Sequence, residues 1–135
     1  DLPISHKKQS LAEHFGDVLF QVKKSWGNQH PLYLDLSRYR PDIAIGRDTA
    51  VEWLFGRARQ LGLLAVPVAG PEVVRGPGTA YLEAVARILR RDGRGVALRI
   101  YGPELRPVGQ LIASLSQLLE TLGVRPEATD LFLDL

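Results

Sequence analysis

The chain has 135 residues, 45% of them hydrophobic and 24% charged, which is the composition of an ordinary folded domain. Its 17 basic and 15 acidic residues leave a net charge of +2, so a strong field toward nucleic acid or membrane surfaces is not indicated. The lack of cysteine excludes disulfides, thiolate metal sites and a cysteine nucleophile, and no apolar run reaches the roughly 18 residues of a membrane-spanning helix.

Helix and strand patterns alternate along the chain. The first helix is predicted after Ser10, which has Glu13 as a capping-box partner, and it should end at Gly27. Asp48 or Thr49 is expected to cap the second helix. The third and fourth helices should end at Asp92-Gly93 and at Gly123, where glycine suits a helix C-terminus. The predicted strands are residues 32–36, 64–68, 96–100 and 131–135, each an apolar run with at most one charged side chain.

The spacing of the strands predicts the fold class. They begin at residues 32, 64, 96 and 131, and each step holds one strand, one loop and one helix, as in a repeated parallel βα unit. Both a partial (β/α) barrel and an open doubly wound sheet fit this order. Because no G-x-G-x-x-G pattern follows a strand, the sequence favours the α/β partial barrel, with four parallel strands alternating with four helices.

Charged residues interrupt three of the apolar strands at equivalent positions. Asp35, Arg99 and Asp134 each lie between apolar neighbours, so alternation should turn them toward the barrel interior near the carboxyl ends of the strands. We interpret these three residues as a candidate catalytic or binding set, with Arg99 holding an anion. A salt-bridge network that only joins the strands explains the same pattern.

Other clusters give weaker functional signals. His6, His14 and His30 form no paired metal-binding pattern, so no metal site is predicted, and the sequence indicates no particular cofactor. The arginines between residues 87 and 94 lie at the end of the third predicted helix, where cations suit the helix dipole. Since aromatic residues are not interleaved with them, nucleic acid is not favoured as a partner.

The whole chain, residues 1–135, is expected to form one domain that is a fragment of a larger (β/α) barrel. It begins Asp-Leu-Pro without an initiator methionine and stops within an apparent strand. A partial barrel leaves two open strand edges, so association through those edges is expected. With no signal peptide visible, a cytoplasmic location is expected.

Five short segments together resemble segments of the phage-type Beta protein family. They occur in the same order as in the family, and the resemblance extends over nearly the whole chain. They begin at Pro31, Leu64, Ala80, Asp92 and Asp130, and read PLYLDL, LAVPV, AYLEAVA, DGRGVALR and DLFLDL. The resemblance implies a barrel-like α/β fold with a further strand before residue 1 and others after residue 135. It carries over no catalytic residue, although Asp35, Arg99 and Asp134 match the recurring polar strand positions.

Two functions remain open. The resemblance implies a link to phages and superinfection exclusion, so one hypothesis is a binding module in phage–host conflict that takes a protein or an anionic small molecule. The alternative is a hydrolase of a phosphorylated substrate, with Asp35 and Asp134 holding a divalent cation and Arg99 on the phosphate. Oxygen ligands would favour Mg²⁺ or Mn²⁺.

Overall fold

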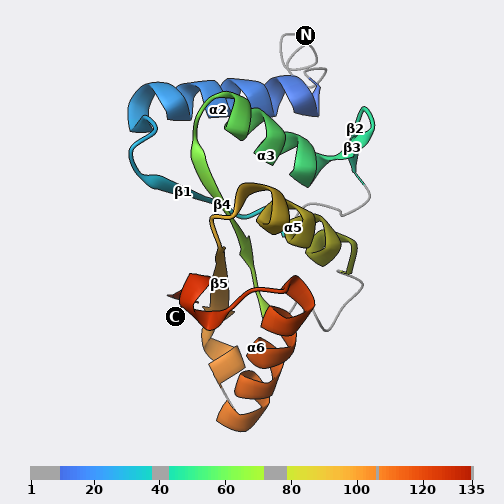
Figure 1. Cartoon of the computed structure of the whole chain (residues 1–135), viewed down its shortest axis with the longest axis vertical. Helices are drawn as coiled ribbons and strands as arrows, with labels where there is room; N and C mark the ends of the chain where they lie inside the picture. The colour runs from blue at the N-terminus through green and yellow to red at the C-terminus, as the bar shows by residue number, and fades with distance from the viewer. Residues whose placement is uncertain (1–9, 38–42, 72–78, 106, 135) are drawn as a thin grey trace, which may run out of the picture.

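The fold is a parallel sheet of four strands curled into a half-barrel, with helices between the strands (Figure 1). The computed structural model describes residues 10–37, 43–71, 79–105 and 107–134. The sheet has the order β1-β4-β5-β6, and every neighbouring pair is parallel. Its strands are β1 (Pro31–Leu34), β4 (Leu64–Ala69), β5 (Val96–Tyr101) and β6 (Thr129–Asp134). The predicted partial barrel is therefore confirmed, and the open doubly wound alternative is not needed.

Four longer helices in the described ranges connect or precede these strands. They are α2 (Leu11–Trp26), α3 (Ala50–Gln60), α5 (Thr79–Asp92) and α6 (Val108–Leu122). Ser10 and Glu13 form the predicted capping box, and Thr49 rather than Asp48 caps α3. Gly123 ends α6 with a left-handed backbone, as the sequence predicted. Within the described ranges, none of these helices has the length and apolar character needed to cross a membrane.

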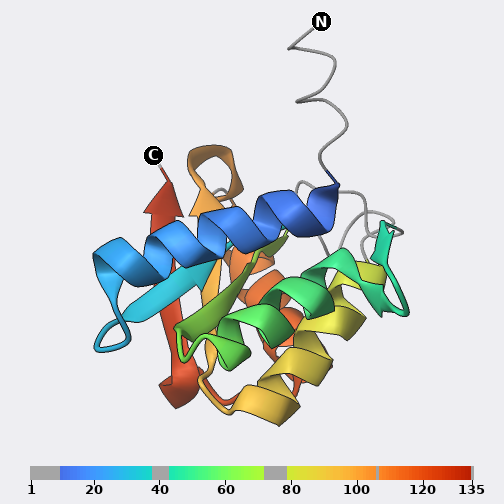
Figure 2. The ribbon, with the colours of Figure 1, turned by 90° about the horizontal axis from the view of Figure 1, so that it is seen from above.

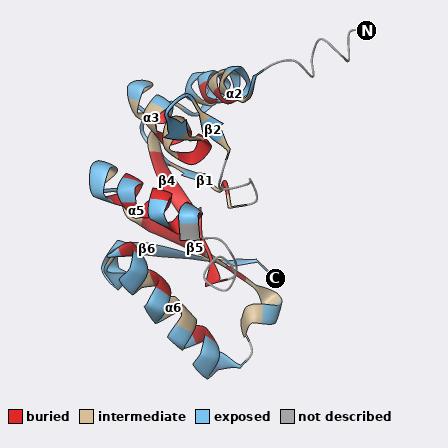
Figure 3. Ribbon diagram, turned by 90° about the vertical axis from the view of Figure 1, so that its right-hand side faces the viewer, coloured by how far each residue is buried: buried red, intermediate tan, exposed pale blue. Residues whose placement is uncertain are grey.

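The core lies between the helices and the convex side of the sheet (Figure 3). Strands β4 and β5 are central and almost wholly buried, while β1 and β6 are the two edge strands. Core side chains come from α2, α3, α5 and α6 as well as from the sheet; Leu19, Phe55, Val85, Leu98 and Leu118 are among those at most 2% exposed. The association expected through the two strand edges stays a prediction.

The structure differs from the sequence prediction in detail. Strand β1 ends at Leu34, so Asp35 directly follows the strand instead of lying within it. Strand β6 starts at Thr129, two residues before the predicted start. The segment before α3 holds a short hairpin, β2 (Ala44–Ile45) with β3 (Asp48–Thr49), which the sequence did not predict. Two-residue strands carry no periodic pattern that a sequence could reveal.

Gly16 in the middle of α2 offers a stabilising substitution. A Cβ built at this position meets no heavy atom within 4 Å, and its backbone is helical. Replacing glycine by alanine reduces the conformational freedom of the unfolded chain without adding strain. We expect Gly16→Ala to raise the free energy of unfolding by about 0.5–1 kcal/mol in urea titrations monitored by circular dichroism. A decrease would contradict the open surroundings of Gly16.

Candidate functional site

Side-chain alternation separates the two faces of the sheet. Leu32 and Leu34 of β1, like Val96 and Leu98 of β5, pack with the core on the helix side. The residues between them face the opposite, concave side. Figure 2 shows the ribbon of the sheet and its helices from above. Arg99 follows this alternation, so the polar residue predicted to face the barrel interior lies on the concave face.

Asp35 and Arg99 are brought together at the carboxyl ends of β1 and β5. The Arg99 Nη1 donates to Asp35 Oδ2 at 2.7 Å, although the two residues are 64 positions apart. Asp35 is held from its other oxygen, because the backbone N–H and the hydroxyl of Ser37 both donate to Oδ1, at 2.9 and 2.6 Å. The Asp35 side chain is 16% exposed and that of Arg99 is 33% exposed. The pair is therefore fixed on the carboxylate side and open to solvent on the guanidinium side.

Tyr81 of α5 lies behind this ion pair and was not singled out by the sequence. Its hydroxyl donates to the backbone carbonyl oxygen of Val68 at the end of β4. Burial raises the pKa of Tyr81 well above its ordinary value, and the negative charge of Asp35 raises it further. The phenol therefore stays neutral at physiological pH and can act as a fixed hydrogen-bond donor. A tyrosine on an apolar helix face gives no sequence signal beyond core packing.

Asp134 is placed apart from the other two predicted site residues. It lies at the end of β6, in register with Tyr101 of β5, and its side chain is exposed. In the part of the chain that the structure describes, no hydrogen bond or ion pair joins Asp134 to Asp35 or to Arg99. The structure thus brings together two of the three predicted residues.

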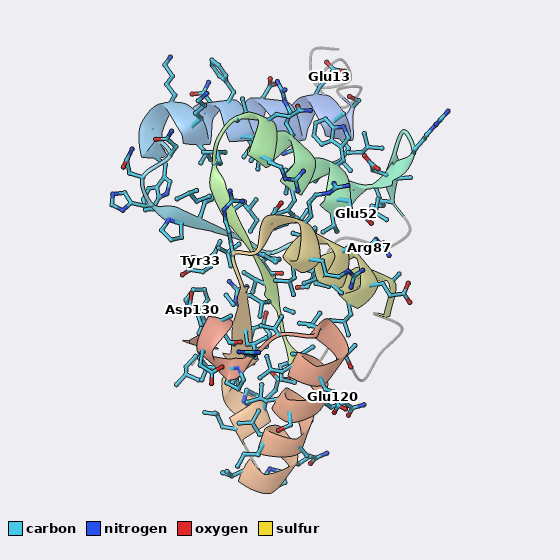
Figure 4. The ribbon with its side chains drawn as sticks, in the orientation of Figure 1. Glu13, Tyr33, Glu52, Arg87, Glu120 and Asp130 are labelled. Carbon is cyan, nitrogen blue, oxygen red and sulfur yellow. The ribbon has the colours of Figure 1, made fainter. Side chains whose placement is uncertain are left out.

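A second polar contact on the concave face links the two edge strands. The hydroxyl of Tyr33 on β1 donates to Asp130 Oδ2 on β6 at 2.7 Å, and the two side chains lie next to each other in Figure 4. The Tyr33 ring also meets the ring of Phe132 edge-on, with 4.8 Å between centroids. The hydrogen bond to Asp130 raises the pKa of Tyr33. Because these residues belong to opposite edges of the sheet, their contact reflects its curl.

The sequence contained a signal for this second contact. Tyr33 lies two residues before Asp35, and Asp130 lies four residues before Asp134, so alternation puts all four on one face. Only a curled sheet brings the two edges within reach. As for metal ligands, no group of three or more histidine and acidic side chains lies close enough to hold an ion within the described residues.

A family profile described as Beta protein matches residues 2–135. The chain belongs to the Beta protein family. No curated protein and no solved structure gives a significant match to this chain. The resemblance of its five strand and helix segments is therefore confirmed at the level of the family, and the roles of Asp35, Arg99 and Asp134 in it stay predictions.

Proposed function

We propose that this member of the Beta protein family is a binding module whose ligand site lies at the carboxyl ends of β1 and β5. Arg99 would bind an anionic group of a small molecule or of a protein, and Asp35 would hold Arg99 in place. The observation that carries this proposal is the ion pair itself, in which one guanidinium nitrogen meets one carboxylate oxygen. A guanidinium has five N–H donors, so this contact leaves binding capacity on a side chain that is one-third exposed.

Preorganisation supports the proposal. Two donors from Ser37 orient Asp35, and the orientation of Arg99 follows from Asp35. A guanidinium held in this way loses less conformational entropy when it binds an anion than a freely moving side chain would. The carboxyl ends of the strands are also where barrel-like α/β proteins bind their ligands. Within the family, we propose that such a module acts in the cytoplasm in phage–host conflict.

The hydrolase alternative receives less support from the arrangement. It needs Asp35 and Asp134 to share a divalent cation, yet both oxygens of Asp35 already accept hydrogen bonds from Ser37 and Arg99. Among the described residues, no group of three or more acidic or histidine side chains is placed to hold a metal ion. Asp35→Asn separates the two ideas. Anion binding should be retained, since the amide oxygen of asparagine can still accept a hydrogen bond from Arg99 and hold it in place, whereas hydrolysis that depends on the Asp35 carboxylate would be lost.

Arg99→Gln tests the binding site directly. We expect it to weaken the binding of inorganic pyrophosphate or of a nucleoside triphosphate roughly tenfold to a hundredfold, because a hydrogen bond to a charged group is lost. Isothermal titration calorimetry, run with and without Mg²⁺, measures the dissociation constant. Arg57→Gln is the matched control, since Arg57 is an exposed arginine of α3 that donates only to Gln60 among the bonds of the described residues. If Arg99→Gln and the wild type bound the anion with equal affinity, the proposed anion site at Arg99 would be refuted.

A further inference from the structure

A second charged surface lies on the outer side of the molecule, away from Arg99. Three exposed arginines of α5, namely Arg87, Arg90 and Arg91, follow one another at helical spacing on one side of the helix. Two hollows flank them. One, of about 420 Å³, is lined by Glu52 of α3 and by Ile88 with the three arginines. We call the surface formed by these three arginines, together with the hollows on either side of them, the α5 basic ridge.

The second hollow lies on the α6 side of the ridge. It has a volume of about 330 Å³ and is lined by Leu82, Glu83, Ala86, Arg87 and Arg90 of α5 together with Thr121 of α6. Leu82 and Ala86 are buried, so they form an apolar floor. The exposed charged side chains at the rim are those of two arginines and of Glu83, so positive charge outnumbers negative charge there. A surface with an apolar floor and a cationic rim suits a ligand that carries both apolar and negatively charged groups.

The charges along the ridge are only partly neutralised. Arg87 donates from Nε and Nη2 to Oε1 of Glu52, at 2.9 and 2.5 Å (Figure 4). Arg90 and Arg91 form no ion pair in the described ranges. The dipole of α5 favours cations in its last turn, which accounts for their presence but not for the apolar hollows beside them. The ridge therefore offers two unpaired guanidinium groups next to apolar surface.

We propose that the α5 basic ridge docks an acidic amphipathic peptide segment of a partner protein. Its carboxylates would pair with Arg90 and Arg91, and an apolar side chain would enter the hollow over Leu82 and Ala86. A helical peptide with glutamates three and four residues apart matches the spacing of the arginines. A single-stranded nucleic acid would instead need aromatic side chains for base stacking, and the two hollows have none among their lining residues.

The test is fluorescence anisotropy with a labelled synthetic peptide that alternates glutamates and leucines on opposite helix faces. The double substitution Arg90→Glu and Arg91→Glu is expected to weaken its binding at least roughly tenfold, and the neutral pair Arg90→Gln and Arg91→Gln should weaken it less. Lys23→Glu with Lys24→Glu is the control, because it makes the same charge change at exposed positions of α2. Circular dichroism of every variant verifies folding.

The outcomes divide clearly. Loss of binding in the Arg90 and Arg91 variants, with binding kept in the Lys23 and Lys24 control, supports the ridge. An equal loss in both pairs, or no binding by the wild type, overturns it. So does equally tight binding of a peptide with serine in place of leucine, because the apolar floor would then have no role. If the wild type bound a single-stranded oligonucleotide of the same charge more tightly than the peptide, the peptide proposal would be overturned and nucleic acid would be the ligand of the ridge.

Discussion

Gly95→Ala is expected to lower the free energy of unfolding by about 2–5 kcal/mol, combining left-handed strain with overpacking. Gly95 precedes β5 and has a φ of +78°, and a Cβ built on it would lie 2.2 Å from the carbonyl oxygen of Ala128. That oxygen belongs to the backbone just before β6, so it can withdraw only if the two strands separate. Urea titration followed by circular dichroism and tryptophan fluorescence measures the loss.

Gly93→Ala is the matched control for this substitution. Gly93 also has a positive φ, of +66°, but a Cβ there meets no heavy atom within 4 Å. Its cost should stay at about 1–2 kcal/mol, the strain of a left-handed alanine alone. If the two variants lost equal stability, the close approach of β5 and β6 at Gly95 would be refuted. Because β5 carries Arg99, Gly95→Ala should also weaken anion binding.

Leu118→Ala is expected to lower the free energy of unfolding by about 3 kcal/mol, because it leaves a cavity in a well-packed core. Leu118 lies in the middle of α6, has no exposed surface and belongs to the main core cluster. Through this cluster α6 is joined to α5 and to the convex face of the sheet. Differential scanning fluorimetry gives the shift in Tm, and urea titration gives the free energy.

Ile112→Ala controls for the helix itself. Ile112 also lies on α6, but its side chain is 59% exposed. Truncating this exposed side chain leaves no cavity in the core, and alanine is the better helix former. The change in the free energy of unfolding should therefore be within about 0.5 kcal/mol of zero. A large loss in Ile112→Ala would mean that the outer face of α6 is covered in solution, and the burial argument for Leu118 would then need revision.

The candidate site was only partly predictable from the residues. Asp35 and Arg99 stood out because each is a charge within an apolar run, and alternation correctly turned them to the concave face. Their pairing depends on how β1 and β5 are placed with β4 between them, which no local pattern contains. Tyr81 and Ser37 were missed, since a buried tyrosine and a loop serine are common residues. The sequence grouped Asp134 with Asp35 and Arg99 because of its equivalent position in its strand. Whether Asp134 comes near Arg99, however, depends on the register of β6 against β5.

The sequence by itself determined the four longer helices, the four strands of the main sheet and their order, but not the short hairpin of β2 and β3. The capping box at Ser10, the glycine at the end of α6 and the apolar strands each act over a few residues, so local patterns were enough to predict a parallel α/β half-barrel. Only the tertiary structure decided which charges meet. The Tyr33–Asp130 bond needs the sheet to curl until its edges approach, and the need for glycine at position 95 arises from a neighbouring strand. Both depend on the summed twist and packing of distant segments, which residue-by-residue patterns do not encode.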